Sequence, residues 1–218
     1  MPARRFLPRR LFPLRHPVAF LPLTALVAMS IAACSRDDEP VPDRVLLFGD
    51  SLLWESADEV GASLAERGWD VGAIRAMPGA TIQGPPLIDW PGVMEAEISD
   101  RRPGTVVIEL GTNGCGNRCT SIDRAIDDTM EAARGVARVV WIGVRLDAPI
   151  PEDPRATNDA LERATDRWPN LDYLTIEGAF DERHISGDDI HFTETGEARF
   201  ADLIAEALGQ PPNDEASR

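Results

Sequence analysis

Short apolar runs alternate with amphipathic stretches from residue 44 almost to the end of this 218-residue chain. The runs are rich in Val, Ile and Leu, as are strands buried on both faces of a parallel sheet. They lie at residues 45–48, 69–76, 105–110, 138–144 and 171–176. Helices are expected at residues 53–67, 93–101, 121–134, 154–168 and 194–208. Five β/α units predict a three-layer α/β/α sandwich around a five-stranded parallel sheet.

The composition is that of one ordinary globular domain, with 43% hydrophobic and 27% charged residues. The formal net charge is −15, and every basic residue other than histidine is Arg. A surface this negative repels phosphate backbones, so nucleic-acid binding is not expected. Gly111, Gly114 and Gly116 lie close together but lack the Gly-x-Gly-x-x-Gly spacing of a dinucleotide loop, and no cofactor is expected.

The first 33 residues have the pattern of an export signal, with an Arg-rich start and an apolar stretch at residues 18–33. That stretch contains Pro22 and is shorter than the ~20 residues of a spanning helix. Ile31-Ala32-Ala33-Cys34 resembles a bacterial lipobox, which implies cleavage before Cys34 and acylation of its thiol. We therefore expect a protein exported to the bacterial cell envelope and anchored to a membrane by lipid. An uncleaved anchor and cleavage elsewhere are the alternatives.

The remaining chain divides into three parts. Residues 34–43 are polar and contain Pro, as in an extended tether. Residues 44–209 form the expected domain, and residues 210–218 form a polar tail.

Cys115 and Cys119 form an even pair once Cys34 is acylated, which suits an oxidising compartment. A disulfide between them would close a small loop in a Gly-rich stretch. Two free thiols are an alternative, and a zinc site is disfavoured because no further ligands lie nearby in the sequence.

Ser51 lies in Gly49-Asp50-Ser51-Leu52, at the turn from the first strand to the first helix. This position exposes the hydroxyl and places the Ser51 N–H at a helix N-terminus, where an anion is favoured. Taken alone, Ser51 would be interpreted as an N-cap. Gly61-Ala62-Ser63-Leu64-Ala65 comes closest to the Gly-x-Ser-x-Gly nucleophile motif, but it lies inside an expected helix.

Two further positions follow strands and could supply hydrogen-bond donors. Asn113, in Leu110-Gly111-Thr112-Asn113, carries an amide suited to stabilising an oxyanion, although a turn role is the alternative. Gly79 follows the second strand and would let a ligand approach its backbone N–H, although Gly after Pro is also typical of a type II turn.

His191 follows the fifth strand, with Asp188 three residues before it. Asp188 can orient the imidazole and stabilise the imidazolium that forms when Ser51 loses its proton. Asp189 is the competing carboxylate. A metal cluster of His184, His191 and these two carboxylates is a further, weaker interpretation. Because ligands bind at the carboxyl ends of parallel strands, Ser51, Asn113 and His191 are expected to meet at one edge of the sheet.

Gly-Asp-Ser-Leu, the later Gly, Gly-Thr-Asn and Asp-x-x-His resemble the four sequence blocks of the SGNH (GDSL) hydrolases, over about residues 44–208. The resemblance implies the flavodoxin-like fold of that family and a catalytic triad of Ser51, His191 and Asp188. It also implies an oxyanion hole of the Ser51 N–H, the Gly79 N–H and the Asn113 amide. The family often has Asp after the block-three Asn, whereas Gly114 stands here. Leu-Gly-Thr-Asn-Gly is similar instead to the SGNH domains of cell-wall O-acetyltransferases.

The sequence therefore predicts a serine esterase that hydrolyses small acyl esters, with acetyl groups on cell-envelope carbohydrate as one candidate substrate. An O-acyltransferase using the same residues is the first alternative. A non-catalytic lipoprotein that binds envelope ligands is the second. No metal is expected in any of these functions.

Overall fold

The computed structural model describes residues 39–83, 88–117, 119–150 and 152–212. The expected signal segment, Cys34, and parts of the tether and the polar tail lie outside these residues. Within the described ranges, no helix is both long and apolar enough to cross a membrane.

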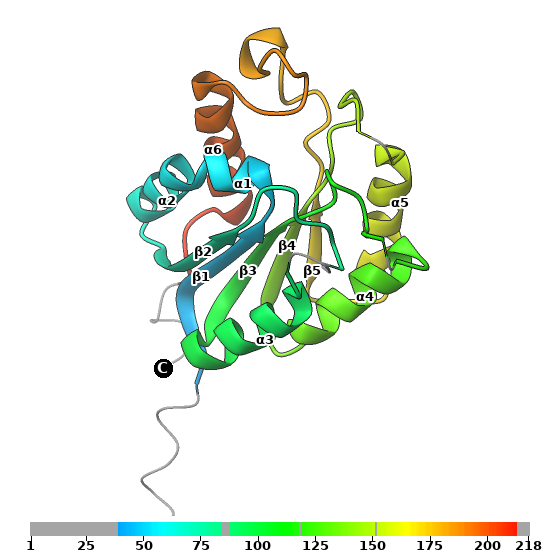
Figure 1. Ribbon diagram of the computed structural model, residues 1–218. Coiled ribbons are helices and arrows are strands. Elements are labelled where there is room, and N and C mark those ends of the chain that lie inside the picture. The colour runs from blue at the N-terminus through cyan, green and yellow to red at the C-terminus, as the bar shows by residue number, and fades with distance from the viewer. Residues whose placement is uncertain (1–38, 84–87, 118, 151, 213–218) are drawn as a thin grey trace, which may run out of the picture. The chain divides into compact units, whose positions relative to one another are not determined.

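Five parallel strands form one sheet in the order β2-β1-β3-β4-β5 (Figure 1). This order is that of flavodoxin-like doubly wound folds, in which the chain reverses its direction of winding between β1 and β3. The predicted fold class is confirmed. The strands are β1 (Val41–Gly49), β2 (Asp70–Ala76), β3 (Pro103–Glu109), β4 (Arg138–Ile142) and β5 (Leu171–Leu174).

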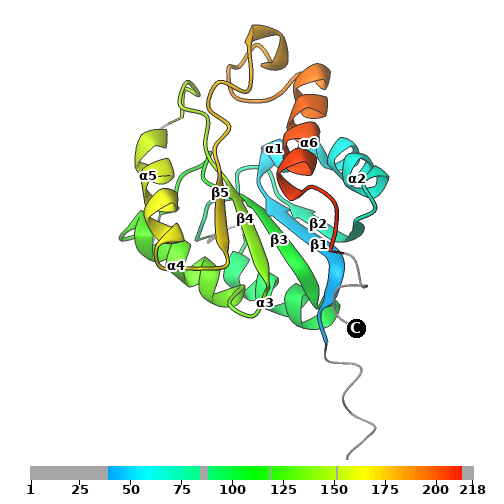
Figure 2. The same ribbon diagram turned by 180° about the vertical axis from the view of Figure 1, so that it is seen from behind.

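Helices cover both faces of the sheet because successive strand residues point to opposite sides. Along β1, Leu46 and Phe48 belong to one hydrophobic cluster, whereas Val45 and Leu47 belong to the other. Figures 1 and 2 show the two helical layers from opposite sides. The first cluster is covered by α3 (Trp90–Arg101), α4 (Ile122–Ala132) and α5 (Pro154–Thr165). The second is covered by α1 (Ser51–Glu55), α2 (Ala57–Glu66) and α6 (Glu194–Leu208).

The expected helix at residues 53–67 is divided into two helices at Ser56. The Ser56 side chain is buried, and its hydroxyl donates a hydrogen bond to the Leu52 carbonyl over 2.8 Å. The Ser56 backbone N–H donates to the same carbonyl over 3.2 Å. Serine often competes with the helix for backbone hydrogen bonds in this way.

The first strand begins at Val41, inside the segment interpreted as a tether. The Val41 N–H donates to the Arg102 carbonyl over 2.7 Å, and Val41 pairs with Pro103 of β3. Pairing is irregular between Val41 and Val45. Pro42 has no N–H for a sheet ladder, which is why the sequence favoured a later start.

The strand register determines which residues meet at the carboxyl edge of the sheet. Gly49, at the end of β1, lies opposite Ala76 of β2 and Glu109 of β3. The loops that carry Ser51, Gly79 and Asn113 therefore leave three neighbouring strands at the same level.

Candidate active site

Ser51 is the first residue of α1, and Asp50 is the N-cap of that helix. The Asp50 carboxylate accepts a hydrogen bond from the Leu52 N–H over 3.1 Å. The interpretation of Ser51 as the cap is therefore wrong, because Asp50 has that role and the Ser51 hydroxyl is bonded elsewhere. Strand-to-helix turns of this kind direct the first helical side chains toward the edge of the sheet.

His191 lies in a loop that is closed at its base. Ile185 and Phe192 form an antiparallel bridge, and the Ser186 N–H donates to the His191 carbonyl over 2.8 Å. The buried ring of Phe192 packs between two aromatic rings, with its centroid 4.7 Å from that of Phe180 and 5.2 Å from that of Phe200. Burial of Phe192 thus fixes the backbone next to His191.

The structure brings the hydroxyl, the imidazole and one carboxylate into a hydrogen-bonded chain. Ser51 Oγ lies 3.0 Å from His191 Nε2, and His191 Nδ1 lies 2.6 Å from Asp188 Oδ2. Ser51 and His191 are 140 positions apart in the sequence, so only the fold can make this contact. The carboxylate bonded to the imidazole is that of Asp188 and not that of Asp189.

Asp188 is oriented by three further hydrogen bonds. Its Oδ1 accepts from the Ser186 hydroxyl over 2.6 Å and from the backbone N–H groups of Ile190 and His191 over 3.0 Å each. Asp189 has a left-handed backbone with φ of 61°, and its carbonyl and that of Ile190 accept hydrogen bonds from Arg145. These contacts join residues 44 and 45 positions apart, so no local sequence pattern indicates them.

The charges of the triad stabilise one another. The hydrogen bond that His191 donates to Asp188 raises the pKa of His191, and Glu55 and Asp50 act in the same direction through their charges. Hydrogen bonds from His191 and Ser186, followed by those from two backbone N–H groups, hold the pKa of Asp188 well below its usual range. An ionised carboxylate therefore faces an imidazole whose protonated form is favoured.

Asn113 and Gly79 lie on the loops next to Ser51. Asn113 Nδ2 donates to Asp50 Oδ2 over 3.1 Å, which leaves its second amide hydrogen for another acceptor. Gly79 lies in the turn after β2 with φ of 75°, and the Ala80 N–H donates to the Met77 carbonyl over 3.0 Å. The type II turn suggested for Pro78-Gly79 is consistent with this geometry, and it does not prevent the Gly79 N–H from acting as a donor.

Cys115 and Cys119 are joined by a disulfide, with their Cα atoms 5.7 Å apart. The carbonyls of Gly114 and Cys115 accept hydrogen bonds from the Ile82 and Gln83 N–H groups, over 3.1 and 3.2 Å. The disulfide loop therefore supports the segment that follows Gly79.

Gly114, the position at which the sequence departs from the family pattern, has φ of 72°. A side chain there would overlap the Glu152 carboxylate, which accepts a hydrogen bond from the Cys115 N–H over 3.2 Å. A carboxylate from the loop before α5 thus occupies the space that a side chain at residue 114 would need.

His184 lies apart from this chain of hydrogen bonds. Its Nδ1 accepts from the Asp181 N–H over 3.1 Å at the 3-10 turn Glu182–His184, and its ring contacts Phe180. Across the described ranges, no three His, Cys, Asp or Glu side chains are grouped as a metal site would need.

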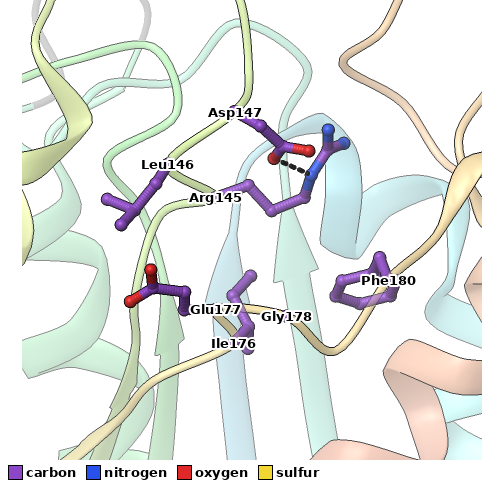
Figure 3. A pocket seen from close by; sticks show the side chains of 7 residues that line it. All are labelled: Arg145, Leu146, Asp147, Ile176, Glu177, Gly178 and Phe180. Carbon is purple, nitrogen blue, oxygen red and sulfur yellow. Dashed lines mark hydrogen bonds and ion pairs between the residues drawn. The ribbon is translucent and has the colours of Figure 1, made fainter.

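A cavity of about 290 Å³ lies beside the His191 loop, at the ends of β4 and β5 (Figure 3). Arg145 lines this cavity and donates hydrogen bonds to the carbonyls of Asp189 and Ile190. Figure 3 shows the Arg145 guanidinium bonded to Asp147, at 3.1 Å. The cavity is lined by Arg145, Leu146, Asp147, Ile176, Glu177, Gly178 and Phe180, and none of the triad residues lines it.

Comparisons with known proteins are informative only at the level of structure. The sequence matches no protein-family model and no curated protein. One similar solved structure is the C-terminal catalytic domain of peptidoglycan O-acetyltransferase A from Streptococcus pneumoniae, with 19% identity and a TM-score of 0.58 over 76% of this chain and 92% of that chain. Another is Est24, a carbohydrate acetylesterase from Sinorhizobium meliloti, with 19% identity and a TM-score of 0.59 over 76% of this chain and 97% of that one.

A third similar structure is a catalytic mutant of Axe2, an acetylxylan esterase from Geobacillus stearothermophilus. It is 13% identical, with a TM-score of 0.57 over 78% of this chain and 95% of that one. Identities this low establish a common fold and not a common substrate. The chain therefore has the α/β/α fold on which these esterases and the acetyltransferase domain are built.

Proposed function

We propose that this protein is a serine esterase of the SGNH type that removes small acyl groups, such as acetyl, from carbohydrate esters. The observation that carries the proposal is the chain from Ser51 Oγ through His191 to Asp188, with distances of 3.0 and 2.6 Å. A hydroxyl, a base and an orienting carboxylate at such distances form an activated nucleophile. The named esterases with the same fold support this choice of reaction.

The first half-reaction forms an acyl-enzyme. Ser51 Oγ attacks the ester carbonyl carbon, and its proton passes to His191 Nε2. The tetrahedral intermediate then collapses as the bond to the leaving alcohol breaks and His191 returns that proton to the alcohol oxygen. In the second half, water attacks the acyl-Ser51 bond with His191 again as base, which releases the carboxylic acid and restores the Ser51 hydroxyl.

The negative charge on the tetrahedral oxygen needs donors beside Ser51. We assign these to the N–H groups of Ser51 and Gly79 and to the second amide hydrogen of Asn113. Loss of one such donor typically lowers kcat by about 10²–10³.

The test is covalent labelling of the purified protein with a fluorophosphonate, together with hydrolysis of acetyl esters. We expect labelling and hydrolysis in the wild type and neither in Ser51→Ala. Ser63→Ala is the matched control, because Ser63 is half-buried on α2 and lies in the sequence closest to the Gly-x-Ser-x-Gly motif. A wild type that neither labels nor hydrolyses any acyl ester would favour the non-catalytic, ligand-binding alternative.

An O-acyltransferase is the second candidate, and two observations favour it. Gly114 replaces the Asp that the family often has, and one similar fold is a peptidoglycan O-acetyltransferase domain. Both functions share the acyl-Ser51 intermediate and differ in whether water or a sugar hydroxyl resolves it. Adding an oligosaccharide acceptor distinguishes them: a transferase yields acylated sugar at the expense of free acid, whereas an esterase yields free acid at an unchanged rate.

We further propose that the protein is exported and held at a bacterial membrane by lipid on Cys34. The support is the lipobox-like Ile31-Ala32-Ala33-Cys34 and the even pair of cysteines that remains. Cys34→Ser should move the protein from the detergent-rich to the aqueous phase on phase partitioning. Equal partitioning of the two forms would exclude the lipid anchor.

A further inference from the structure

Two carboxyl groups that the reaction does not use are buried directly beneath Ser51. Asp50 has no exposed surface and Glu109 is 4% exposed. The register of β1 and β3 makes them neighbours, since Gly49 lies opposite Glu109. Neither carboxyl group forms an ion pair with any residue in the described ranges. Burying two carboxylates together without a cation is strongly unfavourable.

The hydrogen-bond donors around the pair are unequally shared. Asp50 accepts from the Leu52 N–H through Oδ1 and from Asn113 Nδ2 through Oδ2, each over 3.1 Å. Glu109 Oε2 accepts from the Asp50 N–H over 3.1 Å. Of these hydrogen bonds, the Asp50 carboxyl group accepts two and the Glu109 carboxyl group accepts one.

Two carboxyl groups buried side by side without a cation cannot both be ionised, so one of them keeps its proton. Burial, followed by the charge of Asp50, raises the pKa of Glu109 well above its ordinary value. Burial also raises the pKa of Asp50, but hydrogen bonds from Leu52, Glu109 and Asn113 and the charge of His191 act against that rise. The proton therefore belongs to Glu109, and Asp50 is the anion.

We propose that Glu109 keeps its proton at neutral pH and donates it to Asp50, so that this buried pair positions the Asn113 amide beside Ser51. Asp50 and Glu109 are positioning residues, since they act through Asn113 and not on the substrate. This inference rests on the proposed function for its effect on rate, but the protonation of Glu109 stands without it.

The groups that face the pair come from three other segments. The loop before α6 contributes the titratable His191, α1 contributes the backbone N–H of Leu52, and the loop after β3 contributes the neutral Asn113. At alkaline pH, loss of the Glu109 proton would place two anions in contact. Their repulsion would displace Asp50, so that the Asn113 amide would no longer be held in position beside Ser51. The wild type should therefore lose kcat on the alkaline side with little change in KM.

Variants of similar size at residue 109 provide the test. In Glu109→Gln the amide N–H₂ replaces the carboxylic O–H as donor to Asp50, and the amide oxygen still accepts from the backbone. We expect the kcat of Glu109→Gln to be within about threefold of the wild-type value at pH 7.5 and not to fall between pH 7.5 and pH 10. Glu109→Leu cannot donate, and it should lose at least about tenfold in kcat, approaching the effect of a lost oxyanion donor.

Asp50→Asn probes the other partner, because one amide oxygen cannot replace both carboxylate oxygens. We expect kcat to fall about 10- to 100-fold with KM nearly unchanged. The matched controls are Glu162→Gln on α5 and Asp172→Asn on β5, and both should leave kcat and its pH profile unchanged. A Glu109→Gln variant that is folded but as slow as Glu109→Leu would overturn the proposal.

The proton itself is observable without turnover. The side-chain carboxyl ¹³C resonance of Glu109, assigned by its loss in Glu109→Gln, should keep the shift of a carboxylic acid at pH 7.5 in the full chain. A carboxylate shift at that pH would overturn the proposal even if every variant were active. If no ester is hydrolysed but Glu109 is protonated, the proposed function fails and the protonated pair remains.

Discussion

At the scale of single residues, the chemistry of this site depends on which carboxylate faces His191. Asp188 and Asp189 are adjacent, and only Asp188 bonds to the imidazole. The left-handed backbone of Asp189 turns the chain so that the N–H groups of Ile190 and His191 point back to Asp188. The sequence spacing favoured Asp188, and the loop geometry gives the reason.

Asp188→Asn should slow ester hydrolysis and move its pH profile. The hydrogen bond that His191 donates to Asp188 is the main cause of the raised pKa of His191, and the proposed hydrolysis needs neutral His191. The variant should therefore lose about 10²–10⁴ in kcat/KM, and its acid limb should shift to lower pH.

Asp189→Asn is the control for that experiment, because asparagine readily adopts the left-handed conformation. Its rate and its acid limb should match the wild type when kcat/KM is measured from pH 5 to 9. If Asp189→Asn produced the larger loss, the assignment of Asp188 as the orienting carboxylate would be incorrect.

At the scale of elements, the position of His191 depends on how the start of α6 packs against the 3-10 turn Glu182–His184. Thr193 caps α6, accepting from the Gly196 N–H over 3.3 Å, and its hydroxyl donates to the Arg183 carbonyl over 2.7 Å. Gly196 has no room for a side chain, since a Cβ there would overlap the His184 carbonyl.

Gly196→Ala should therefore displace the turn and with it the His191 loop. We expect a loss of about 1–3 kcal/mol in the free energy of unfolding, typical of overpacking, together with reduced kcat. Gly61→Ala in α2 is the matched control, because its Cβ would meet only the Ile74 side chain at 3.7 Å. Helix propensity should make that variant up to about 1 kcal/mol more stable than the wild type. Urea denaturation of both variants measures the difference, and equal stability would contradict this account.

The disulfide loop acts at the same scale. Replacing Cys115 and Cys119 with Ser removes a disulfide that closes a short loop. Such a crosslink contributes about 2 kcal/mol or less to the free energy of unfolding. Because the Gly114 and Cys115 carbonyls hold the Ile82 and Gln83 N–H groups, the double variant should lose kcat as well as stability. Thermal unfolding and ester hydrolysis, each with and without a thiol reductant, check this. If the reductant lowered the stability and kcat of the wild type and of the double variant equally, the disulfide would not be the cause of the loss.

At the scale of the whole molecule, the net charge of −15 acts on every approaching substrate. Acidic side chains also lie near the site, since the charges of Glu55 and Asp50 raise the pKa of His191. On α6, burial followed by the charges of Glu59 and Glu55 raises the pKa of Glu197. The field around the site thus favours neutral or cationic esters over anionic ones.

An acetyl ester that carries a sulfonate should consequently have a lower kcat/KM than its neutral isostere at low salt. Raising the ionic strength from 0.01 to 1 M shortens the screening length from ~30 to ~3 Å and should reduce the difference in kcat/KM between the two esters. The neutral ester serves as the control, with a rate that changes little. If the difference in kcat/KM did not change with salt, steric exclusion of the sulfonate and not charge would be its cause.

The sequence by itself determined the alternation of strands and helices, and it located the loops that carry Ser51, Asn113 and His191. These features follow from local periodicity and turn residues, which operate over a few positions. The tertiary structure decided what depends on contacts between distant segments. Asp50 meets Glu109 from 59 positions away, and an acid directly after the apolar run Val106-Val107-Ile108 was the available signal.

The early start of β1 was also decided by the fold, because pairing with Pro103 recruits Val41 into the sheet. The division of the first helix has a local cause, since the Ser56 hydroxyl bonds to the Leu52 carbonyl four positions earlier. Local propensity opposes only the early start of β1, where Pro42 lacks an N–H. Hydrogen bonding across the sheet prevails there because it supplies more free energy than the preference of a single residue.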